Sequence, residues 1–189
     1  VFSSYSVIGG GYYNWNYGQQ TTIGGGTSNW LYGAYYGTQA GGHNHYVYSY
    51  SASVAGGMYG SVYSSYGTVG GGWYIHCHGQ HGTITGGHSN WVYGSYGFVG
   101  GGISLYNYGD YATLGGGTDN YVYTGYSTIA GGYYNFVYGF TATVGGGMYN
   151  SAYGSWSSTD GGYSNRAFGS HSSVGGGYYN YIYSYGATI

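Results

Sequence analysis

Side chains able to carry out acid–base or nucleophilic chemistry are rare in this sequence. The 189 residues include three carboxylates, one cationic side chain and one cysteine, namely Asp110, Asp119, Asp160, Arg166 and Cys77. The carboxylates fall in different repeats of the pattern described below, so no pair is placed for general acid–base catalysis. Cys77 occupies an inward aliphatic position, where a small core residue is a better interpretation than a nucleophile. We therefore predict no enzymatic activity and no cofactor.

Three histidines are the best candidates for metal ligands. His76 and His78 alternate along one predicted strand and point to the same side, and His81 follows just around the next turn. Each of them occupies a repeat position that is otherwise filled by aromatic residues. A place in an aromatic ladder is therefore the better interpretation, and we expect no bound metal.

The overall composition excludes several classes of protein. The chain has 46 Gly, 33 Tyr, no Pro and a formal net charge of −2, while 42% of its residues are hydrophobic. Disordered chains combine low hydrophobicity with high net charge, so this composition indicates a fibrous or repetitive folded protein. A single cation cannot form a basic patch, which excludes nucleic acid as a partner. No run of about 18 apolar residues is present, so we predict no membrane span.

The glycines divide the sequence into short repeats. Their clusters end every fifteen residues, with one step of sixteen, at Gly11, Gly26, Gly42, Gly57, Gly72, Gly87, Gly102, Gly117, Gly132, Gly147, Gly162 and Gly177. The extra residue falls near Ala34 or Tyr35, where we expect a bulge at a turn. Nothing interrupts the array, so residues 1–189 are predicted to form one tandem-repeat domain.

Each repeat contains two half-repeats, which read x-x-Asn-x-Val-x-Gly and Ser-Tyr-Ala-Thr-Val-Gly-Gly-Gly. Short alternation bounded by glycine is typical of half-buried strands, and frequent glycine with β-branched and aromatic residues disfavours helices. The sequence predicts an all-β fold, a two-strand β-roll solenoid of about twelve coils of 15 residues. Its narrow core is predicted to consist of Val and Ile columns and an asparagine ladder.

The period-two rule assigns equivalent residues to inward columns. Aliphatic residues form two of these columns, represented by Val92, Val122, Val137 and Ile182 in the first half and by Ile84, Val99, Leu114, Ile129 and Val144 in the second. A third column holds Asn90, Asn120, Asn135, Asn150, Asn165 and Asn180. We expect these amides to hydrogen-bond their counterparts one coil away. The last two glycines of each cluster are both expected to need positive φ or close backbone approach.

Two outward columns of the first half-repeat are aromatic. They are represented by Trp15, Tyr17, Trp30, Tyr32, Tyr46, Tyr48, Trp91, Tyr93, Tyr106, Tyr108, Tyr121, Tyr123, Phe136, Tyr138, Tyr181 and Tyr183. Soluble monomers rarely expose an apolar patch larger than roughly 300–600 Å². We therefore interpret this face as an interface, with other copies of the chain as the expected partner and glycans as the alternative.

The half-repeat motifs and the Thr-Val-Gly-Gly-Gly junction resemble the β-roll repeats of two families. One is the grass ice-recrystallisation inhibitors, and the other is the heads of trimeric autotransporter adhesins on bacterial surfaces. The first resemblance implies an ice-binding face, for which the column Thr22, Thr68, Thr83, Thr113, Thr128, Thr143 and Thr188 is the candidate. The second implies adhesion to glycans or cell surfaces through a trimer.

The function expected from the sequence is structural. Val1 and Ile189 both fall on aliphatic columns, which predicts a solenoid that is uncapped at both ends and able to stack end to end. Together with the aromatic face, this pattern predicts an extracellular or cell-surface filament or stalk. Adhesion and ice binding are the two alternative functions.

Overall fold

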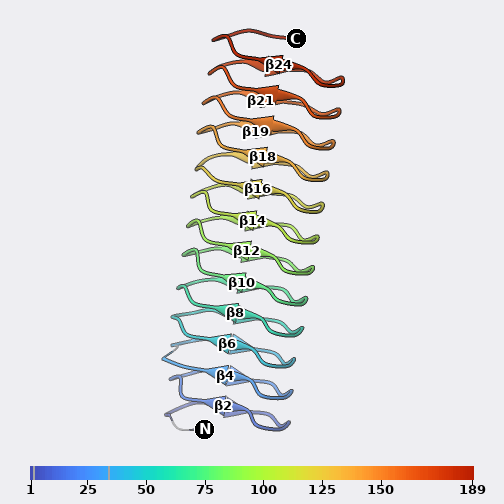
Figure 1. Cartoon of the computed structure of the whole chain (residues 1–189). Helices are drawn as coiled ribbons and strands as arrows, with labels where there is room; N and C mark the ends of the chain where they lie inside the picture. Colours follow the sequence, from blue (N-terminus) through green and yellow to red (C-terminus); the bar gives the residue numbers. More distant parts are fainter. Residues whose placement is uncertain (2, 34) are drawn as a thin grey trace.

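The computed structural model describes residues 1, 3–33 and 35–189. The chain is wound into a rod of stacked coils, with its first residues at one end and its last residues at the other (Figure 1). All strands are two residues long, and the described residues contain no helix. The predicted all-β solenoid is confirmed.

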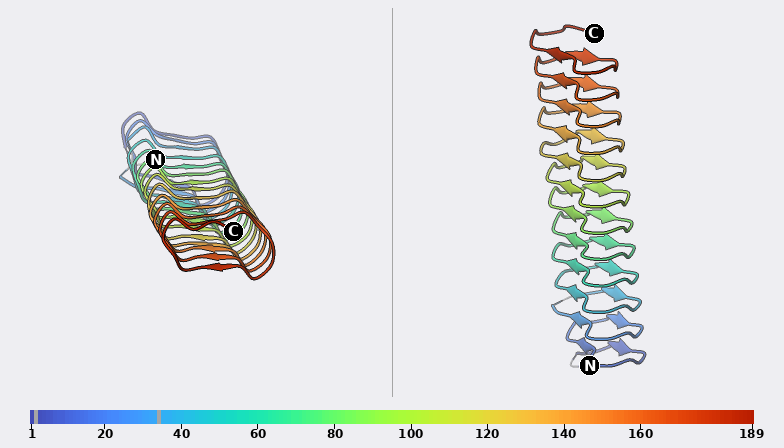
Figure 2. Two further views of the ribbon diagram at one scale, coloured as in Figure 1. Left: turned by 90° about the horizontal axis from the view of Figure 1, so that it is seen from above. Right: turned by 45° about the vertical axis from the view of Figure 1, so that its right-hand side comes forward.

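Two parallel sheets of 12 strands each run along the rod, and Figure 2 shows the flat outline that they give each coil. Odd-numbered strands form the sheet that we call the threonine sheet: β1 (Val7–Ile8), β3 (Thr22–Ile23), β5 (Thr38–Gln39), β7 (Ser53–Val54), β9 (Thr68–Val69), β11 (Thr83–Ile84), β13 (Phe98–Val99), β15 (Thr113–Leu114), β17 (Thr128–Ile129), β19 (Thr143–Val144), β21 (Ser158–Thr159) and β23 (Ser173–Val174). Even-numbered strands form the aromatic sheet: β2 (Trp15–Asn16), β4 (Trp30–Leu31), β6 (Tyr46–Val47), β8 (Ser61–Val62), β10 (His76–Cys77), β12 (Trp91–Val92), β14 (Tyr106–Asn107), β16 (Tyr121–Val122), β18 (Phe136–Val137), β20 (Ser151–Ala152), β22 (Arg166–Ala167) and β24 (Tyr181–Ile182).

The strand register locates the extra residue of the one long repeat. Leu31 still pairs with Asn16, fifteen residues earlier, whereas Tyr35 pairs with Gln19, sixteen residues earlier. The insertion therefore lies after Leu31 and no later than Tyr35, as the glycine spacing predicts. Ala34, one of the two predicted positions, lies outside the described residues.

The core consists of the two predicted aliphatic columns facing each other. Val122 and Val137 on the aromatic sheet and Ile129 and Val144 on the threonine sheet are all fully buried. Polar residues replace the aliphatic side chain in four coils, at Asn16, Gln39, Asn107 and Thr159. Strand alternation places these residues inside regardless of their polarity, where an unpaired polar group is unfavourable.

The buried asparagine column is confirmed, and each amide bonds its counterpart one coil away, but it does so through that residue's backbone N–H and not through its side-chain amide. The Nδ2 of Asn135 donates to the carbonyl oxygens of Gly131, at 3.0 Å, and Gly147, at 3.1 Å. Its Oδ1 accepts the backbone N–H of Asn150, one coil later, at 2.8 Å. Each amide thus bridges backbone groups of its own coil and of the next coil. The corner carbonyls, and not the neighbouring side-chain amides, accept from the Nδ2.

The corners confirm in part the prediction that both final glycines need positive φ or close backbone approach. The last glycine of every cluster has a positive φ, as in Gly132 at 94°. A Cβ on Gly132 would overlap the carbonyl oxygen of Gly147, whereas a Cβ on Gly131 would meet nothing within 4 Å. Only the last glycine is therefore required in this cluster, whereas in five other clusters, such as Gly146 and Gly147, both glycines have positive φ. Two further corners per coil place non-glycine residues in the left-handed region, such as Tyr126 and Tyr134, both at 56°.

Candidate interaction surfaces

The aromatic sheet carries an unbroken column of stacked rings, which we call the second aromatic column. It holds one ring from each coil, directly after the even-numbered strands: Tyr17, Tyr32, Tyr48, Tyr63, His78, Tyr93, Tyr108, Tyr123, Tyr138, Tyr153, Phe168 and Tyr183. Successive ring centroids are 4.6 to 5.6 Å apart, with interplanar angles of 1° to 15°. The parallel strand register brings all the predicted members together and adds Phe168, which the sequence interpretation left out.

A second row of rings, the first aromatic column, stands on the strands themselves. It comprises Trp15, Trp30, Tyr46, His76, Trp91, Tyr106, Tyr121, Phe136 and Tyr181, and it is interrupted by Ser61, Ser151 and Arg166. Tyr121, for example, lies 5.0 Å from Tyr106 and 5.2 Å from Phe136. This column therefore consists of separate stacks, although its positions in the repeat are the predicted ones.

The two aromatic columns form one nearly planar array of uncharged rings. Tyr121 and Tyr123 of the same coil lie 6.2 Å apart with an interplanar angle of 8°. Partial burial, together with the neighbouring phenols of Tyr123 and Tyr153, raises the pKa of Tyr138 to about 12. Burial likewise raises the pKa of Tyr93 and Tyr108. The array therefore carries hydroxyl groups without negative charge at neutral pH.

Another stack follows the corner where each coil passes from the aromatic sheet to the threonine sheet. Tyr66, His81, Tyr96, Tyr111 and Tyr126 have successive centroid distances of 4.6 to 5.0 Å. These are residues with positive φ. Their fifteen-residue spacing could have predicted this stack from the sequence. The sequence interpretation considered the strand positions and missed these corner residues.

The structure does not bring the three candidate metal ligands together. His76 stacks on Trp91 at 3.9 Å, and its ring centroid is 6.5 Å from that of His78. His81 belongs to the corner stack, between Tyr66 and Tyr96. Among residues 1, 3–33 and 35–189, no group of three His, Cys, Asp or Glu side chains is placed to hold a metal ion. Desolvation lowers the pKa of both His76 and His78, which favours neutral rings within the stacks.

Cys77 lies in the core, as predicted. Its side chain is fully buried in β10, and burial raises the pKa of the thiol to about 11. The Sγ donates weakly to the carbonyl oxygen of Gly79, at 3.7 Å. A buried, protonated thiol is a poor nucleophile, so its position is that of a small core residue.

The threonine column lies on the opposite sheet, at its predicted positions. Thr113 pairs with Thr128 and Thr128 with Thr143 in consecutive coils, and Thr188 pairs with Ser173 in the last one. Phe98 interrupts the column between Thr83 and Thr113. The neighbouring outward position is occupied mainly by Gly or Ala, so the regular hydroxyl groups form a single row.

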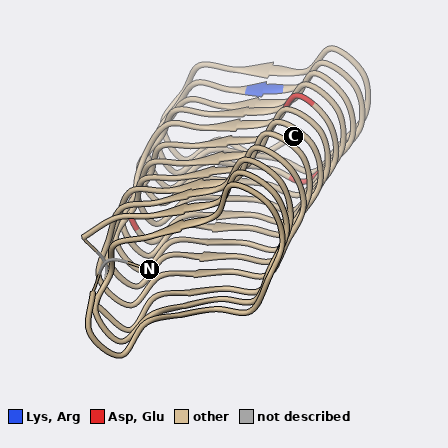
Figure 3. Ribbon diagram, turned by 90° about the horizontal axis from the view of Figure 1, so that it is seen from below, with Lys and Arg blue, Asp and Glu red and all other residues tan. Residues whose placement is uncertain are grey.

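Charge is nearly absent from both faces. Figure 3 shows Arg166 on its strand and the three aspartates as isolated coloured segments. The Arg166 guanidinium lies over the ring of Tyr181, 5.6 Å from its centroid. None of the described elements is a helix that is long and apolar enough to cross a membrane.

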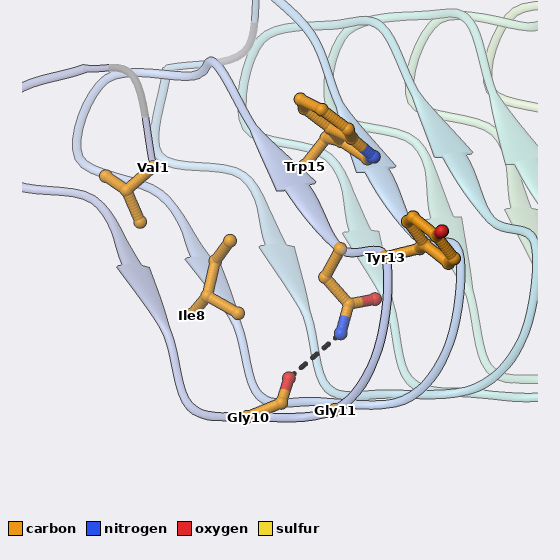
Figure 4. A pocket seen from close by; sticks show the side chains of 7 residues that line it. Val1, Ile8, Gly10, Gly11, Tyr13 and Trp15 are labelled. Carbon is orange, nitrogen blue, oxygen red and sulfur yellow. Dashed lines mark hydrogen bonds between the residues drawn. The ribbon is translucent and has the colours of Figure 1, made fainter.

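A cavity of about 390 Å³ lies beside the first coil, lined in part by Ile8, Tyr13 and Trp15. Asn14 also lines the cavity, and its Nδ2 donates to the carbonyl oxygen of Gly10 at 2.9 Å, the hydrogen bond drawn as a dashed line in Figure 4. This bond is the first of the amide bridges that recur along the rod. The cavity has Val1 on its wall, and we assign it no function.

Comparison with known proteins gives no further assignment. No protein-family model matches the chain, and no curated protein sequence is significantly similar to it.

Proposed function

We propose that this chain is a structural protein whose copies associate side by side through their aromatic sheets to form a filament or stalk. The observation that carries the proposal is the second aromatic column, which runs through all twelve coils without a break. Consecutive rings repeat at the inter-strand spacing of about 4.8 Å, so two copies match each other at every one-coil step. Such a surface is complementary to itself along its whole length.

The exposed aromatic area is large enough for a stable contact. Tyr93, Tyr108 and Tyr123 are 39%, 42% and 40% exposed. If a free aromatic side chain offers about 200 Å², twelve such rings present on the order of 1,000 Å². Stable interfaces bury about 800 Å² per partner. With a net charge of −2, little electrostatic repulsion opposes the approach of another copy.

The stacking geometry favours another copy over a glycan as the partner. Sugars pack on the open face of an aromatic ring, but both faces of Tyr123 are covered, by Tyr108 at 5.5 Å and by Tyr138 at 4.7 Å. Ring edges and hydroxyl groups are left for the partner. The same column on a second copy offers ring edges that pack between these edges and hydroxyl groups that hydrogen-bond to these hydroxyl groups.

An extracellular or cell-surface location is part of the proposal. The chain has one Arg and no Lys, so trypsin-like proteases find a single cleavage residue. The ladder hydrogen bonds of the two sheets further restrict cleavage to locally opened states. Antibody labelling of intact, unpermeabilised cells tests the location.

The assembly test compares substitutions on the two sheets. The unmodified chain should form filaments as its concentration rises, measured by sedimentation velocity and electron microscopy. The double variant Tyr108→Lys/Tyr123→Lys places two charges on the aromatic sheet and should remain monomeric. Thr113→Lys/Thr128→Lys places the same charges on the opposite sheet and should still assemble. A monomeric unmodified chain, or equal loss of assembly in both variants, contradicts the proposal.

The same pair of variants separates assembly from ice binding. If the threonine column bound ice, Thr113→Lys/Thr128→Lys would abolish ice shaping, whereas Tyr108→Lys/Tyr123→Lys would preserve it. Phe98 interrupts the threonine column. The neighbouring outward row is rich in glycine, so the sheet has no second regular row of hydroxyl groups. We therefore expect no faceted ice crystals from the unmodified chain.

A further inference from the structure

Ser61 leaves a gap in the first aromatic column. The register of β8 places Ser61 directly between Tyr46 of the preceding coil and His76 of the following coil. Both neighbours carry rings, but Ser61 has only a hydroxymethyl group. One ring is therefore missing from a stack whose two flanking members are present.

A partly open surface cavity of about 240 Å³ lies at the gap. Tyr46, Ser61 and His76, three successive members of the first aromatic column, line it together with Asn44, and Ser61 is itself buried. Tyr63 borders it on the side of the second aromatic column, and Tyr59 and Tyr74 border it at the corner, stacked on each other at 4.8 Å. None of the lining side chains is Asp, Glu, Lys or Arg.

The repeat itself shows what fits such a space. In a later coil the same position is occupied by Tyr121, whose ring is sandwiched between Tyr106 and Phe136 at 5.0 and 5.2 Å. Two coil steps separate the residues that flank Ser61, as they do those that flank Tyr121, so the spacing admits one ring. His76 stacks closely on Trp91, at 3.9 Å, and so lies toward the next coil and away from the gap.

The other serine in this column does not create an equivalent space. Ser151 lies between Phe136 and Arg166, and the Arg166 guanidinium is directed over Tyr181. A ring above Ser151 would have only one aromatic neighbour in the column. This position supplies a matched control for the gap at Ser61.

We propose that the gap at Ser61 is a binding site for an uncharged, planar aromatic compound of one ring or two fused rings. The ligand completes the interrupted stack between Tyr46 and His76. A dry cavity of about 150 Å³ holds benzene, so a space of this size suits a phenol, an indole or a naphthol. The absence of charged lining side chains selects against aromatic acids and amines. This site does not depend on filament assembly.

Titration with 2-naphthol tests the proposal, with ligand fluorescence measured at a protein concentration where the chain is monomeric. The unmodified chain should bind saturably with one site per chain. Ser61→Tyr fills the gap with the residue that the repeat uses elsewhere, and affinity should fall at least tenfold. Ser151→Tyr should bind as the unmodified chain does. Equal binding by Ser61→Tyr, or titration without saturation, overturns the site.

A second variant keeps the test decisive if Ser61→Tyr disturbs the fold. His76→Ala removes one flanking ring while leaving the gap open, and it should weaken 2-naphthol binding about tenfold. His171→Ala, at an exposed corner, should leave binding unchanged. Equal affinities for the two histidine variants contradict two-sided stacking. Binding that arises only in assembled chains would instead assign the gap to an aromatic side chain of another copy, and the proposal would be wrong.

Discussion

The Nδ1 of His45 accepts a hydrogen bond from the backbone N–H of Gly60, one coil later, at 2.9 Å. Its Nε2 lies 3.1 Å from the carbonyl oxygen of Gly57, to which it donates. His45 thus makes two of the bonds that asparagine makes in other coils. Its larger ring occupies space that a Cβ at position 60 would need, since that atom would lie 2.7 Å from the Nδ1. His45 and Gly60 therefore form a matched pair within the asparagine column.

Acidification should destabilise the solenoid through this histidine. The core position requires a neutral ring, and burial lowers the pKa of His45 below its ordinary value of 6.5. The folded state then binds fewer protons than the unfolded state, so stability is complete above about pH 6.5 and falls as pH decreases through the folded pKa. Denaturant unfolding above and below pH 6.5 measures the loss.

The control for this prediction is His45→Asn, which restores the usual residue of the column. This variant should show a smaller loss of stability on acidification than the unmodified chain. The residual loss belongs to His76 and His78, whose pKa values desolvation also lowers. An unchanged pH profile in His45→Asn would contradict the role assigned to His45.

Replacing a bridging asparagine should be costly. Asn135→Ala leaves the buried N–H of Asn150 and the half-buried carbonyl of Gly131 unpaired, whereas the Gly147 carbonyl still accepts from the backbone N–H of Tyr133 at 2.9 Å. At about 1–3 kcal/mol per unpaired group, the loss of unfolding free energy should be about 2 kcal/mol or more. Chemical denaturation measures it.

Asn135→Leu is the informative companion, because Leu105 occupies the same column position and is fully buried. Leucine should recover part of the stability by filling the volume that alanine leaves empty. Equal stability of Asn135→Ala and the unmodified chain would show that the amide bridges contribute nothing.

Gly131 and Gly132, the two final glycines of one cluster, should respond differently to the same substitution. Gly132→Ala forces a Cβ into the carbonyl of Gly147 at a φ of 94°, and it should destabilise the chain by about 1–3 kcal/mol or more. Gly131→Ala meets open space and should be nearly neutral. Thermal unfolding of both variants distinguishes them, and equal melting temperatures would contradict the assignment of the corner.

Which side chains face the core and which face solvent could be predicted from the sequence, because two regular patterns apply together. Alternation within a strand fixes the face, and the fifteen-residue repeat stacks equal residues, so Val122 and Tyr123 were correctly separated. Hydrogen bonding across the corner could not be predicted, because it depends on where the carbonyls of Gly131 and Gly147 lie relative to Asn135. Positive φ at Tyr126 and Tyr134 carries no residue signature, since neighbouring contacts impose it against the residue's own preference.

The gap at Ser61 illustrates the same limit for the candidate sites. In the sequence, a serine in an aromatic column indicates only that one ring is missing from that column. Whether a cavity forms at the missing ring depends on His76 lying toward Trp91 and on Tyr59 and Tyr74 lining one side. Those positions follow from the stacking of complete coils and not from local pattern.

Gln39 is a polar residue of the threonine-sheet core whose side chain is left without hydrogen-bond partners. Its side chain is fully buried in β5, and neither Nε2 nor Oε1 has a hydrogen-bond partner among the described residues. The neighbouring coils place Ile23 and Val54 at the equivalent position, and Leu114 occupies it in β15. Gln39→Leu should therefore remove the cost of two unpaired polar atoms and raise the unfolding free energy by about 1–3 kcal/mol. Asn107→Leu is the contrasting variant, because the Asn107 amide donates to Ala112 at 2.8 Å and accepts from Gly109 at 3.1 Å. It should destabilise the chain, and a gain of stability in both variants would show that core polarity alone, and not unmet hydrogen bonding, limits the stability of the rod.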